Sequence, residues 1–450
     1  MPKYDVIVVG GGPGGSDCAI RLSQRGKKVA IVERKEFGGT CTNVGCIPTK
    51  ALLTVAKLYS DIKEKGKRLG VLAQVDIDLK TVMKHMNRSI LMSRKGTETL
   101  LKKYGVEIIK DNVVYKNGSF YLENANEILD TEKIVLATGS KPKIPKTLAV
   151  EGIWTSNEVF SMSEFPESIL IIGAGYIGVE MATIFNAFGT KVILVELQPR
   201  IIPFEDIDAS IVLEKSLKKR GVKVKTGVAV EKIEKLDNGF LTALSDGEQL
   251  ETEKVLVAIG RAPVYPEGLE DTELVENGKI TTNKDFETKW PNVYAIGDVR
   301  GAIMLAHVAS AEGIALAEKL SGKDYDYYSE TVPAVIFCEP EIGSTGIKET
   351  EDGLSDDYDK FLFPMSANPR ANILAERDGF VKLIANKSDH KIVGITIVGP
   401  NAVELLMEGV VVINEQLTVE ELLKSIHPHP TLSEIIRDAA EGLEGNPIHI

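Results

Sequence analysis

The residues of this chain best suited to redox chemistry are two cysteines in the stretch 38-GGTCTNVGCIPTK-50. Cys41 and Cys46 stand five positions apart, and in a regular helix this spacing separates the Cα atoms by about 8 Å and puts the side chains on different faces. A disulfide needs Cα atoms roughly 4.4–6.8 Å apart. Either the two cysteines are not partners, or the backbone between them departs from a regular helix.

The composition narrows the class of protein. The 450 residues carry a formal net charge of −12, which disfavours nucleic acid and anionic membranes as partners. No apolar run approaches the ~18 residues needed to span a bilayer, and the N-terminal apolar core is too short for a signal peptide. We therefore expect a cytoplasmic protein of roughly two to four domains. In a reducing compartment, a close cysteine pair indicates catalysis or metal binding rather than structural cross-linking.

One sequence module occurs twice. Segments 6–33 and 169–196 align without a gap, and each predicts a buried strand, a Gly-rich turn, a helix and a second strand ending in Glu. The glycines of the two turns match in pairs: Gly10 with Gly173, Gly12 with Gly175, and Gly15 with Gly178. Such a pattern is the dinucleotide-binding fingerprint, and its presence in two aligned copies makes two unliganded turns an improbable alternative.

Each part of the fingerprint has a physical role. The first glycine permits a tight turn, the second admits the pyrophosphate, and the third lets helix and strand pack closely. The helix N-terminus donates to the phosphates, and Glu33 and Glu196 accept from ribose hydroxyls. Two dinucleotides on one chain suggest electron transfer between them. Glu196 would repel a 2′-phosphate and so favours NAD over NADP, although the nearby Arg200 leaves that choice open.

The remaining pattern predicts an α/β protein with two Rossmann-like dinucleotide-binding domains and a C-terminal α+β domain. We expect the first domain to comprise 1–142 and 262–328, and the second to be inserted as 143–261. Residues 141–145 are expected to form a linker. Residues 329–450 carry strand and helix patterns without a fingerprint and form the last domain.

Together these motifs resemble those of the pyridine nucleotide–disulfide oxidoreductases, specifically the class I flavoprotein disulfide reductases. The segments that carry the resemblance span the chain in the family's order: GGGPGG, GGTCTNVGCIPTK, ATGS, GAGYIGVE, VAIGRAP, AIGD, LAHVASAEG, PEIGSTG and HPTLSE. The resemblance implies FAD at the first fingerprint, NAD at the second, and a homodimer joined through the last domain.

The resemblance also implies roles for individual residues. Cys41 and Cys46 would form a redox disulfide, with Cys41 exchanging with the substrate and Cys46 facing the flavin. His429 would be the catalytic base, oriented by Glu434 and acting on the cysteines of the other subunit. The residues implied for FAD are Gly10, Gly12, Gly15, Glu33, Lys50, Val113, Gly139, Asp298 and Ala306. The residues implied for NAD are Gly173, Gly175, Tyr176, Ile177, Gly178, Glu180, Glu196, Val228 and Gly260.

The residues of the motifs CIPTKALL and HPTLSE most resemble those of the branch of the family that oxidises dihydrolipoamide. Its substrates would be lipoyl domains of 2-oxoacid dehydrogenase or glycine-cleavage complexes. Alternatives are a glutathione-, coenzyme A- or mercuric-reductase-like enzyme, or a flavin-binding redox sensor without fast turnover. No metal is expected, because His427 and His429 alone are too few ligands.

Within this family, the five-residue cysteine spacing becomes a structural prediction. Gly45 should let the turn leave helical geometry so that Cys41 and Cys46 come within bonding reach. Pro48 suits the first turn of the helix that follows. Cys46 would then lie at a helix N-terminus, where the dipole lowers a thiol pKa.

Overall fold

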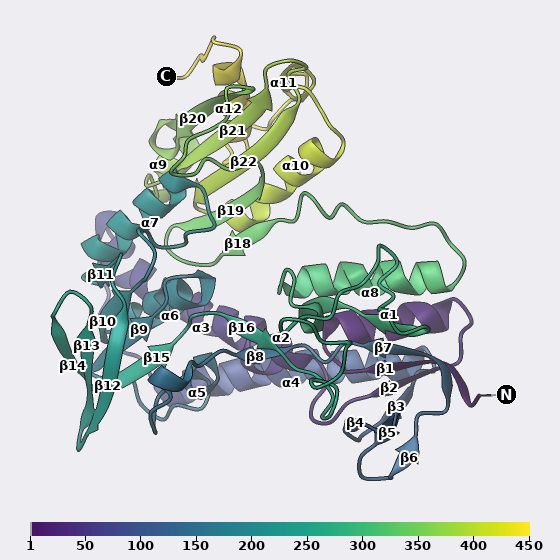
Figure 1. Ribbon diagram of the computed structural model, residues 1–450. Coiled ribbons are helices and arrows are strands. Elements are labelled where there is room, and N and C mark those ends of the chain that lie inside the picture. Colours follow the sequence, from purple (N-terminus) through teal and green to yellow (C-terminus); the bar gives the residue numbers. More distant parts are fainter. Residues whose placement is uncertain (1) are drawn as a thin grey trace.

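The computed structural model describes residues 2–450, which form two nucleotide-binding folds and a C-terminal sheet domain (Figure 1). The first fold is a parallel sheet covered on one face by α1 (Pro13–Gln24) and α8 (Ala306–Leu320). Its strands, in spatial order, are β17 (Val293–Ala295), β7 (Thr131–Leu136), β1 (Tyr4–Val9), β2 (Val29–Val32) and β3 (Glu107–Ile109). Because β17 follows the second fold in sequence, the chain returns to its first sheet.

The second fold begins with the same strand–turn–helix unit as the first and has a parallel sheet of its own. Its strands, in spatial order, are β11 (Lys223–Lys225), β10 (Lys191–Val195), β9 (Ser168–Ile172) and β15 (Lys254–Val257). Helix α6 (Tyr176–Ala187) follows β9 as α1 follows β1, so both predicted strand–turn–helix units are confirmed. The remaining elements are α7 (Ile207–Lys219), β12 (Val230–Leu236), β13 (Gly239–Leu244) and β14 (Gln249–Thr252).

The prediction of a linker at 141–145 was wrong in part. β8 (Ser140–Pro142) pairs antiparallel with β16 (Arg261–Pro263), so the two connections between the folds form a small ribbon. Proline is tolerated there because each strand of a two-stranded ribbon is an edge strand, and its missing N–H can face outward. The expected domain limits at 142 and 261 both fall inside this ribbon.

Between β2 and β3 of the first sheet, the chain forms the cysteine segment and two long helices. α2 (Gly39–Val44) leads into α3 (Cys46–Ser60), a π-helical turn (Asp61–Gly66) and α4 (Leu79–Lys103). The shorter elements of the two folds are β4 (Val113–Lys116), β5 (Ser119–Leu122), β6 (Glu127–Ile128) and α5 (Ser156–Val159), with 3₁₀ turns at Lys146–Leu148 and Gly297–Arg300.

The C-terminal domain is an antiparallel sheet with helices packed on it (Figure 1). Its strands, in spatial order, are β18 (Ala334–Ile336), β19 (Glu341–Gly346), β22 (Ile392–Gly399), β21 (Phe380–Asn386) and β20 (Tyr358–Pro364). Its helices are α9 (Pro369–Leu374), α10 (Ala402–Asn414), α11 (Val419–Leu423) and α12 (Glu434–Leu443), with a 3₁₀ turn at Met365–Ala367. The prediction of a C-terminal α+β domain is therefore confirmed.

A shared hydrophobic core joins α3 and α4 to the second fold and to the C-terminal sheet. One buried cluster joins Leu52 of α3 and Ile90 of α4 to Ile171 of β9 and Val398 of β22. Burial of this apolar surface fixes the cysteine-bearing helices against both the second fold and the C-terminal sheet. Among the helices of residues 2–450, none is long and apolar enough to cross a membrane.

Candidate active site

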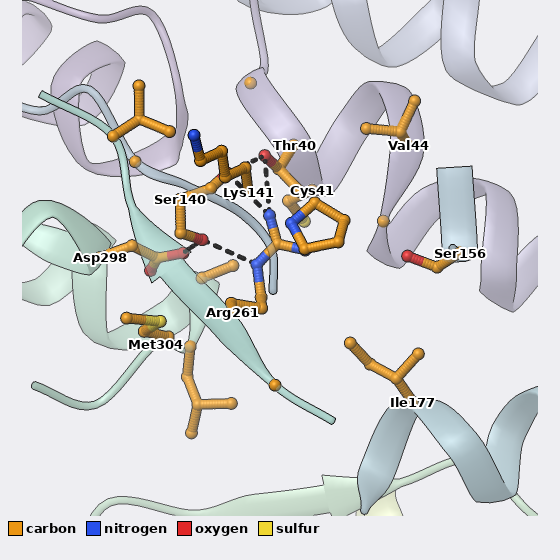
Figure 2. Close-up of a pocket in the computed structure, with 18 of the residues that line it drawn as sticks. Thr40, Cys41, Val44, Ser140, Lys141, Ser156, Ile177, Arg261, Asp298 and Met304 are labelled. Atoms are coloured by element: carbon orange, nitrogen blue, oxygen red, sulfur yellow. Dashed lines mark hydrogen bonds between the residues drawn. The ribbon is translucent and has the colours of Figure 1, made fainter. Parts of the chain in front are cut away.

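A cavity of about 1980 Å³ is lined by residues of both nucleotide-binding folds. Sites for one small molecule usually measure roughly 300–1,000 Å³, so this cavity has room for more than one extended ligand. Both Gly-rich turns, both terminal glutamates and both Cys41 and Cys46 lie on its wall. Figure 2 shows the part of the cavity around Cys41.

Close backbone contacts explain the first and third glycines of each turn. A Cβ on Gly10 would lie 2.3 Å from the carbonyl oxygen of Ala137, and one on Gly15 would lie 2.0 Å from that of Gly10. The second turn repeats this, because a Cβ on Gly178 would lie 1.9 Å from the carbonyl oxygen of Gly173. Gly178, which was expected to bind NAD, does not line the cavity; it lets α6 pack against its own turn.

The middle glycines face open space instead. A Cβ on Gly12 would find its nearest neighbour 3.9 Å away, and one on Gly175 would find nothing within 4 Å. Both residues line the cavity and immediately precede the helices α1 and α6. The backbone at each helix N-terminus is therefore accessible to a phosphate, and both turns fit a dinucleotide.

Glu33 and Glu196, the glutamates that follow the second strand of each unit, are held by equivalent backbone hydrogen bonds. Glu33 accepts hydrogen bonds from the backbone N–H of Gly11 at 2.7 Å and of Lys35 at 2.7 Å. Glu196 accepts from the N–H of Ala174 at 2.7 Å and of Gln198 at 2.8 Å. Two backbone donors fix each carboxylate at the cavity wall, and an ionised carboxylate has further lone pairs for ribose hydroxyls.

Arg200 is turned away from the second nucleotide site. Its guanidinium donates to Glu351 of the C-terminal domain and to the carbonyl oxygens of Ile202 at 3.1 Å and Pro203 at 2.8 Å. The side chain is buried and does not line the cavity. Arg200 therefore does not accompany Glu196 at the cavity wall, and the arrangement favours NAD.

The other residues expected to bind the cofactors also line the cavity: Lys50, Val113, Gly139, Asp298, Ala306, Tyr176, Ile177, Glu180, Val228 and Gly260. Gly139 has a φ of +75°, which favours glycine at this turn after β7. Ala306 is the first residue of α8, so its position is again a helix N-terminus facing the cavity.

Asp298 belongs to a hydrogen-bonded chain that sequence reasoning missed (Figure 2). Ser140 donates its hydroxyl to Asp298, and Arg261 donates from Nε to the Ser140 hydroxyl at 2.7 Å and from a terminal nitrogen to the Ser140 carbonyl at 2.8 Å. Burial lowers the pKa of Arg261 from its ordinary value, with Asp298 opposing the shift. The available signal was a charged residue directly after the strand-end glycine in VAIGRAP.

The cysteine segment breaks between two helices, as predicted. Cys41 lies in α2, whereas Cys46 is the first residue of α3, and Gly45 between them has non-helical φ and ψ of −144° and −112°. A Cβ on Gly45 would lie 2.8 Å from the carbonyl oxygen of Thr40 and 3.2 Å from the Cα of Cys41. The absence of a side chain at Gly45 therefore lets the chain fold back and bring the two thiols together.

The two thiols differ in acidity. A hydrogen bond from Cys41, together with the positive charge of Lys50, lowers the pKa of Cys46 to about 7 against the opposing effect of burial. The same hydrogen bond, followed by burial, raises the pKa of Cys41. Both residues are present as free thiols. When the pair is reduced, Cys46 is therefore the residue that carries the negative charge.

Lys50 links the cysteine helix to the second fold. Its ammonium group lies 2.7 Å and 2.9 Å from the two carboxylate oxygens of Glu180 in α6. Glu180 is buried and also accepts from the N–H of Phe337 at 3.1 Å, and Lys50 sits 4.7 Å from the centre of the Phe337 ring. The ion pair thus ties α3, α6 and the C-terminal domain together beside Cys46.

The structure does not bring His429 and Glu434 to the cavity. Nδ1 of His429 lies 2.9 Å from Oε1 of Glu434, and Oε2 of Glu434 accepts from the N–H of Thr431 at 2.7 Å. Burial raises the pKa of Glu434, but the hydrogen bonds from Thr431 and His429 outweigh it and leave this pKa below its ordinary value. The His429 side chain is 69% exposed and precedes α12, which begins at Glu434. Helix α12 packs in the C-terminal domain (Figure 1).

Comparison with known proteins agrees with this geometry. Residues 4–313 match the family model "Pyridine nucleotide-disulphide oxidoreductase", and residues 332–440 match its "dimerisation domain". A dihydrolipoyl dehydrogenase of Bacillus subtilis is 37% identical, with 99% of both chains aligned. The mitochondrial dihydrolipoyl dehydrogenase of Pisum sativum is 36% identical over 100% of this chain and 93% of its own length.

Solved structures show the same fold. LpdA from Mycobacterium tuberculosis superposes with a TM-score of 0.89 at 25% identity, covering 98% of this chain and 99% of the other. The HOCl-induced flavoprotein disulfide reductase RclA from Escherichia coli superposes with a TM-score of 0.87 at 26% identity, with the same coverage.

Two dinucleotide sites that meet at a cysteine pair define an oxidoreductase that exchanges electrons between thiols and a nicotinamide cofactor. The chain belongs to the pyridine nucleotide-disulphide oxidoreductase family. It is an FAD-dependent, NAD-linked enzyme, and the accessible turns at Gly12 and Gly175 fit these two cofactors.

Proposed function

We propose that the chain acts as a dihydrolipoyl dehydrogenase, oxidising protein-bound dihydrolipoamide at Cys41 and Cys46. The observation that carries the proposal is geometric: Cys41 and Cys46 lie on the wall of the cavity that both Gly-rich turns share, and Gly45 lets the chain fold back between them. The relatives at 36–37% identity over nearly the whole chain are dihydrolipoyl dehydrogenases, which favours this dithiol over glutathione or coenzyme A.

The reaction begins from the Cys41–Cys46 disulfide. His429 removes a proton from one substrate thiol, since only the thiolate attacks a disulfide. The substrate sulfur bonds to Cys41, the Cys41–Cys46 bond breaks, and Cys46 leaves as a thiolate. The second substrate thiol then attacks the substrate sulfur bound to Cys41 and gives its proton to Cys41. The bond between Cys41 and the substrate breaks, and Cys41 leaves as a thiol. The substrate leaves as a disulfide, and its two electrons remain on the cysteine pair.

The lowered pKa of Cys46 suits it to be the leaving group. A thiol of lower pKa leaves faster, and Lys50 stabilises the thiolate that forms. Bound FAD supplies a two-electron acceptor between this pair and NAD. The first Gly-rich turn, Glu33 and Asp298 would hold FAD, and the second turn with Glu196 would hold NAD.

The proposal includes an active homodimer. His429 is exposed and remote from the cavity of its own chain, so we assign it to the cysteine pair of the second copy. The dimerisation-domain match at residues 332–440 supports this arrangement. The proposed FAD-binding domain comprises residues 1–142 and 262–328. The proposed NAD-binding domain comprises 143–261, and the proposed dimerisation domain comprises 329–450. Lipoyl domains of 2-oxoacid dehydrogenase or glycine-cleavage complexes would be the physical substrates.

The test is a steady-state panel on the purified flavoprotein. Dihydrolipoamide with NAD should give NADH rapidly, and the Cys46→Ser variant should lose at least about a hundredfold of this rate. The disulfides of glutathione and coenzyme A, each tried with NADH and NADPH, should react far more slowly. Faster turnover of one of these disulfides than of lipoamide would reassign the substrate. Failure with every dithiol and disulfide would favour a redox sensor.

A further inference from the structure

A buried polar network joins the second nucleotide site to the C-terminal domain. Its centre is Glu205, which is 1% exposed and lies between β10 and α7. One carboxylate oxygen accepts from the hydroxyl of Tyr176. The other accepts from the hydroxyl of Ser344 and from the ammonium group of Lys348 at 2.9 Å, and both of these belong to the C-terminal part of the chain.

Tyr176 lies at the start of α6, beside the second Gly-rich turn. It is the first residue of the helix and directly follows Gly175, whose backbone faces the cavity. Tyr176 is also one of the residues that line the cavity. Tyr176 and Glu180 are four residues apart and therefore share one face of α6. Lys50 holds Glu180 and Glu205 holds Tyr176, so this face is fixed at two successive turns.

The segment that carries Glu205 is itself held in an unusual conformation. Ile202 is fully buried with a φ of +41°, which is rare for a β-branched residue, and its N–H donates to the carbonyl oxygen of Ala174 at 2.8 Å. Asp206 pairs with the buried Lys382 of β21 at 2.8 Å. Backbone strain of this kind persists only where surrounding contacts enforce it, and it concentrates at functional sites.

We propose that Glu205 is a positioning residue for NAD: it holds the Tyr176 hydroxyl so that the ring stays against the cavity wall beside the helix N-terminus that receives the dinucleotide. Ser344 and Lys348 hold Glu205 in turn, so the C-terminal domain contributes to nucleotide affinity without contacting the nucleotide. A ring fixed before binding loses less conformational freedom when the ligand arrives.

The protonation state of Tyr176 is compatible with this role. Burial and the charge of Glu205 raise the pKa of Tyr176 above its ordinary value. The hydroxyl therefore remains a hydrogen-bond donor to the carboxylate throughout the neutral range.

The experiment measures binding of oxidised NAD to the oxidised holoenzyme by titration calorimetry. Tyr176→Phe removes the donor of this hydrogen bond and Glu205→Met removes its acceptor, so each should weaken NAD binding by about three- to tenfold. The double variant should be no weaker than either single variant, because the two residues act through one contact. Tyr59→Phe makes the same chemical change outside the cavity and should leave NAD affinity unchanged.

A merely structural role would give a different pattern. In Tyr176→Phe the KM for NAD should rise by the same factor as the loss of affinity, whereas a general loss of folding would also lower the content of bound FAD. If Glu205→Met fails to fold, Tyr176→Phe alone still decides. Unchanged NAD affinity in Tyr176→Phe, or additive losses in the double variant, would overturn the inference. The inference rests on the proposed use of NAD; a wild-type enzyme that did not bind NAD would instead refute that function.

Discussion

Cys46 is the first residue of α3, and Lys50 stands four residues further along the same helix. This spacing puts both side chains on one face of the helix. The Lys50 ammonium group is held there by Glu180 at 2.7 Å, so its charge stays beside the thiol rather than moving into solvent. The helix N-terminus and the lysine thus act on the same sulfur, which is the one that must carry charge after the disulfide opens.

Replacing the lysine should therefore change the acidity of the thiol. In wild-type reduced enzyme, the Cys46 thiolate is lost as the pH falls through about 7. In Lys50→Met the pKa of Cys46 should rise towards the ordinary thiol value of about 8.5. The rate of alkylation of Cys46 by iodoacetamide, followed against pH by mass spectrometry, measures this midpoint. Lys57→Met removes a lysine of the same helix that pairs with Glu376 and should leave the midpoint unchanged. If the alkylation midpoint of Lys50→Met equals that of the wild type, Lys50 does not lower the pKa of Cys46.

The break between the two cysteines depends on Gly45. In Gly45→Ala the new Cβ meets backbone atoms at 2.8 Å and 3.2 Å, so the turn must open. We expect a loss of about 1–3 kcal/mol in the free energy of unfolding and slow closure of the Cys41–Cys46 disulfide. Denaturant unfolding and the rate of disulfide formation measure the two effects.

The matched control is Gly96→Ala in the middle of α4. A Cβ on Gly96 would find nothing within 4 Å, and its φ is not positive. The free energy of unfolding of this variant should rise by about 0.5–1 kcal/mol, because alanine restricts the unfolded chain more than glycine does. Wild-type disulfide closure in Gly45→Ala would mean that the turn tolerates a side chain and that the proposed geometry is wrong.

Local pattern and motif were sufficient for much of the architecture. The duplicated strand–turn–helix units, the helix at 306–320 and the break at Gly45 depend on residues close in sequence, and the structure has all of them. The glycine spacing also predicted two dinucleotide-binding turns, and the structure shows both on the wall of one cavity. These features follow from backbone sterics and hydrophobic period, which neighbouring residues determine.

Contacts between distant segments were not predictable in the same way. Arg200 is close to Glu196 in sequence, yet Glu351 of another domain turns its guanidinium away. The residues 141–142 pair with 261–262, so a prolyl segment that reads as a linker becomes a strand. His429 lies outside the cavity of its own chain, and the family resemblance rather than any local pattern predicted that it acts on the other subunit.

The position of Arg200 leads to a prediction about nucleotide choice. Glu196→Ser removes the acceptor for the ribose hydroxyl and should raise the KM for NAD by about tenfold. NADPH should remain a poor substrate of this variant, because Arg200 stays bound to Glu351 and to two carbonyl oxygens. Glu231→Ser, on the exposed part of β12, is the control. Efficient use of NADPH by Glu196→Ser would show that Arg200 is free to reach a 2′-phosphate.

Acid should weaken the packing of α1 on α8. Arg25 and Arg21 donate to Glu318 at 2.6 Å, and these bonds lower the pKa of Glu318 to about 2. Because this pKa lies below the unfolded value of about 4.3, the stabilisation is present above that value and disappears as the pH falls towards 2. Thermal unfolding temperature should drop over this window, and Glu318→Gln should reduce the drop. An identical pH profile in the variant would exclude Glu318 as its source.

A shared active site can be tested by complementation between subunits. A heterodimer is prepared from one Cys46→Ser chain and one His429→Ala chain. If His429 serves the cysteines of the other copy, one site of this heterodimer pairs an intact Cys46 with an intact His429, and the other site lacks both. Each homodimeric variant should be nearly inactive, because a general base contributes about 10²–10⁴ in rate. The heterodimer, isolated with two affinity tags, should therefore recover close to half of the wild-type rate with dihydrolipoamide. Were His429 to act within its own chain, each site would lack one of the two residues and the heterodimer would be as inactive as its parents. His429 is 69% exposed, so His429→Ala should fold normally, and its thermal unfolding temperature should match that of the wild type.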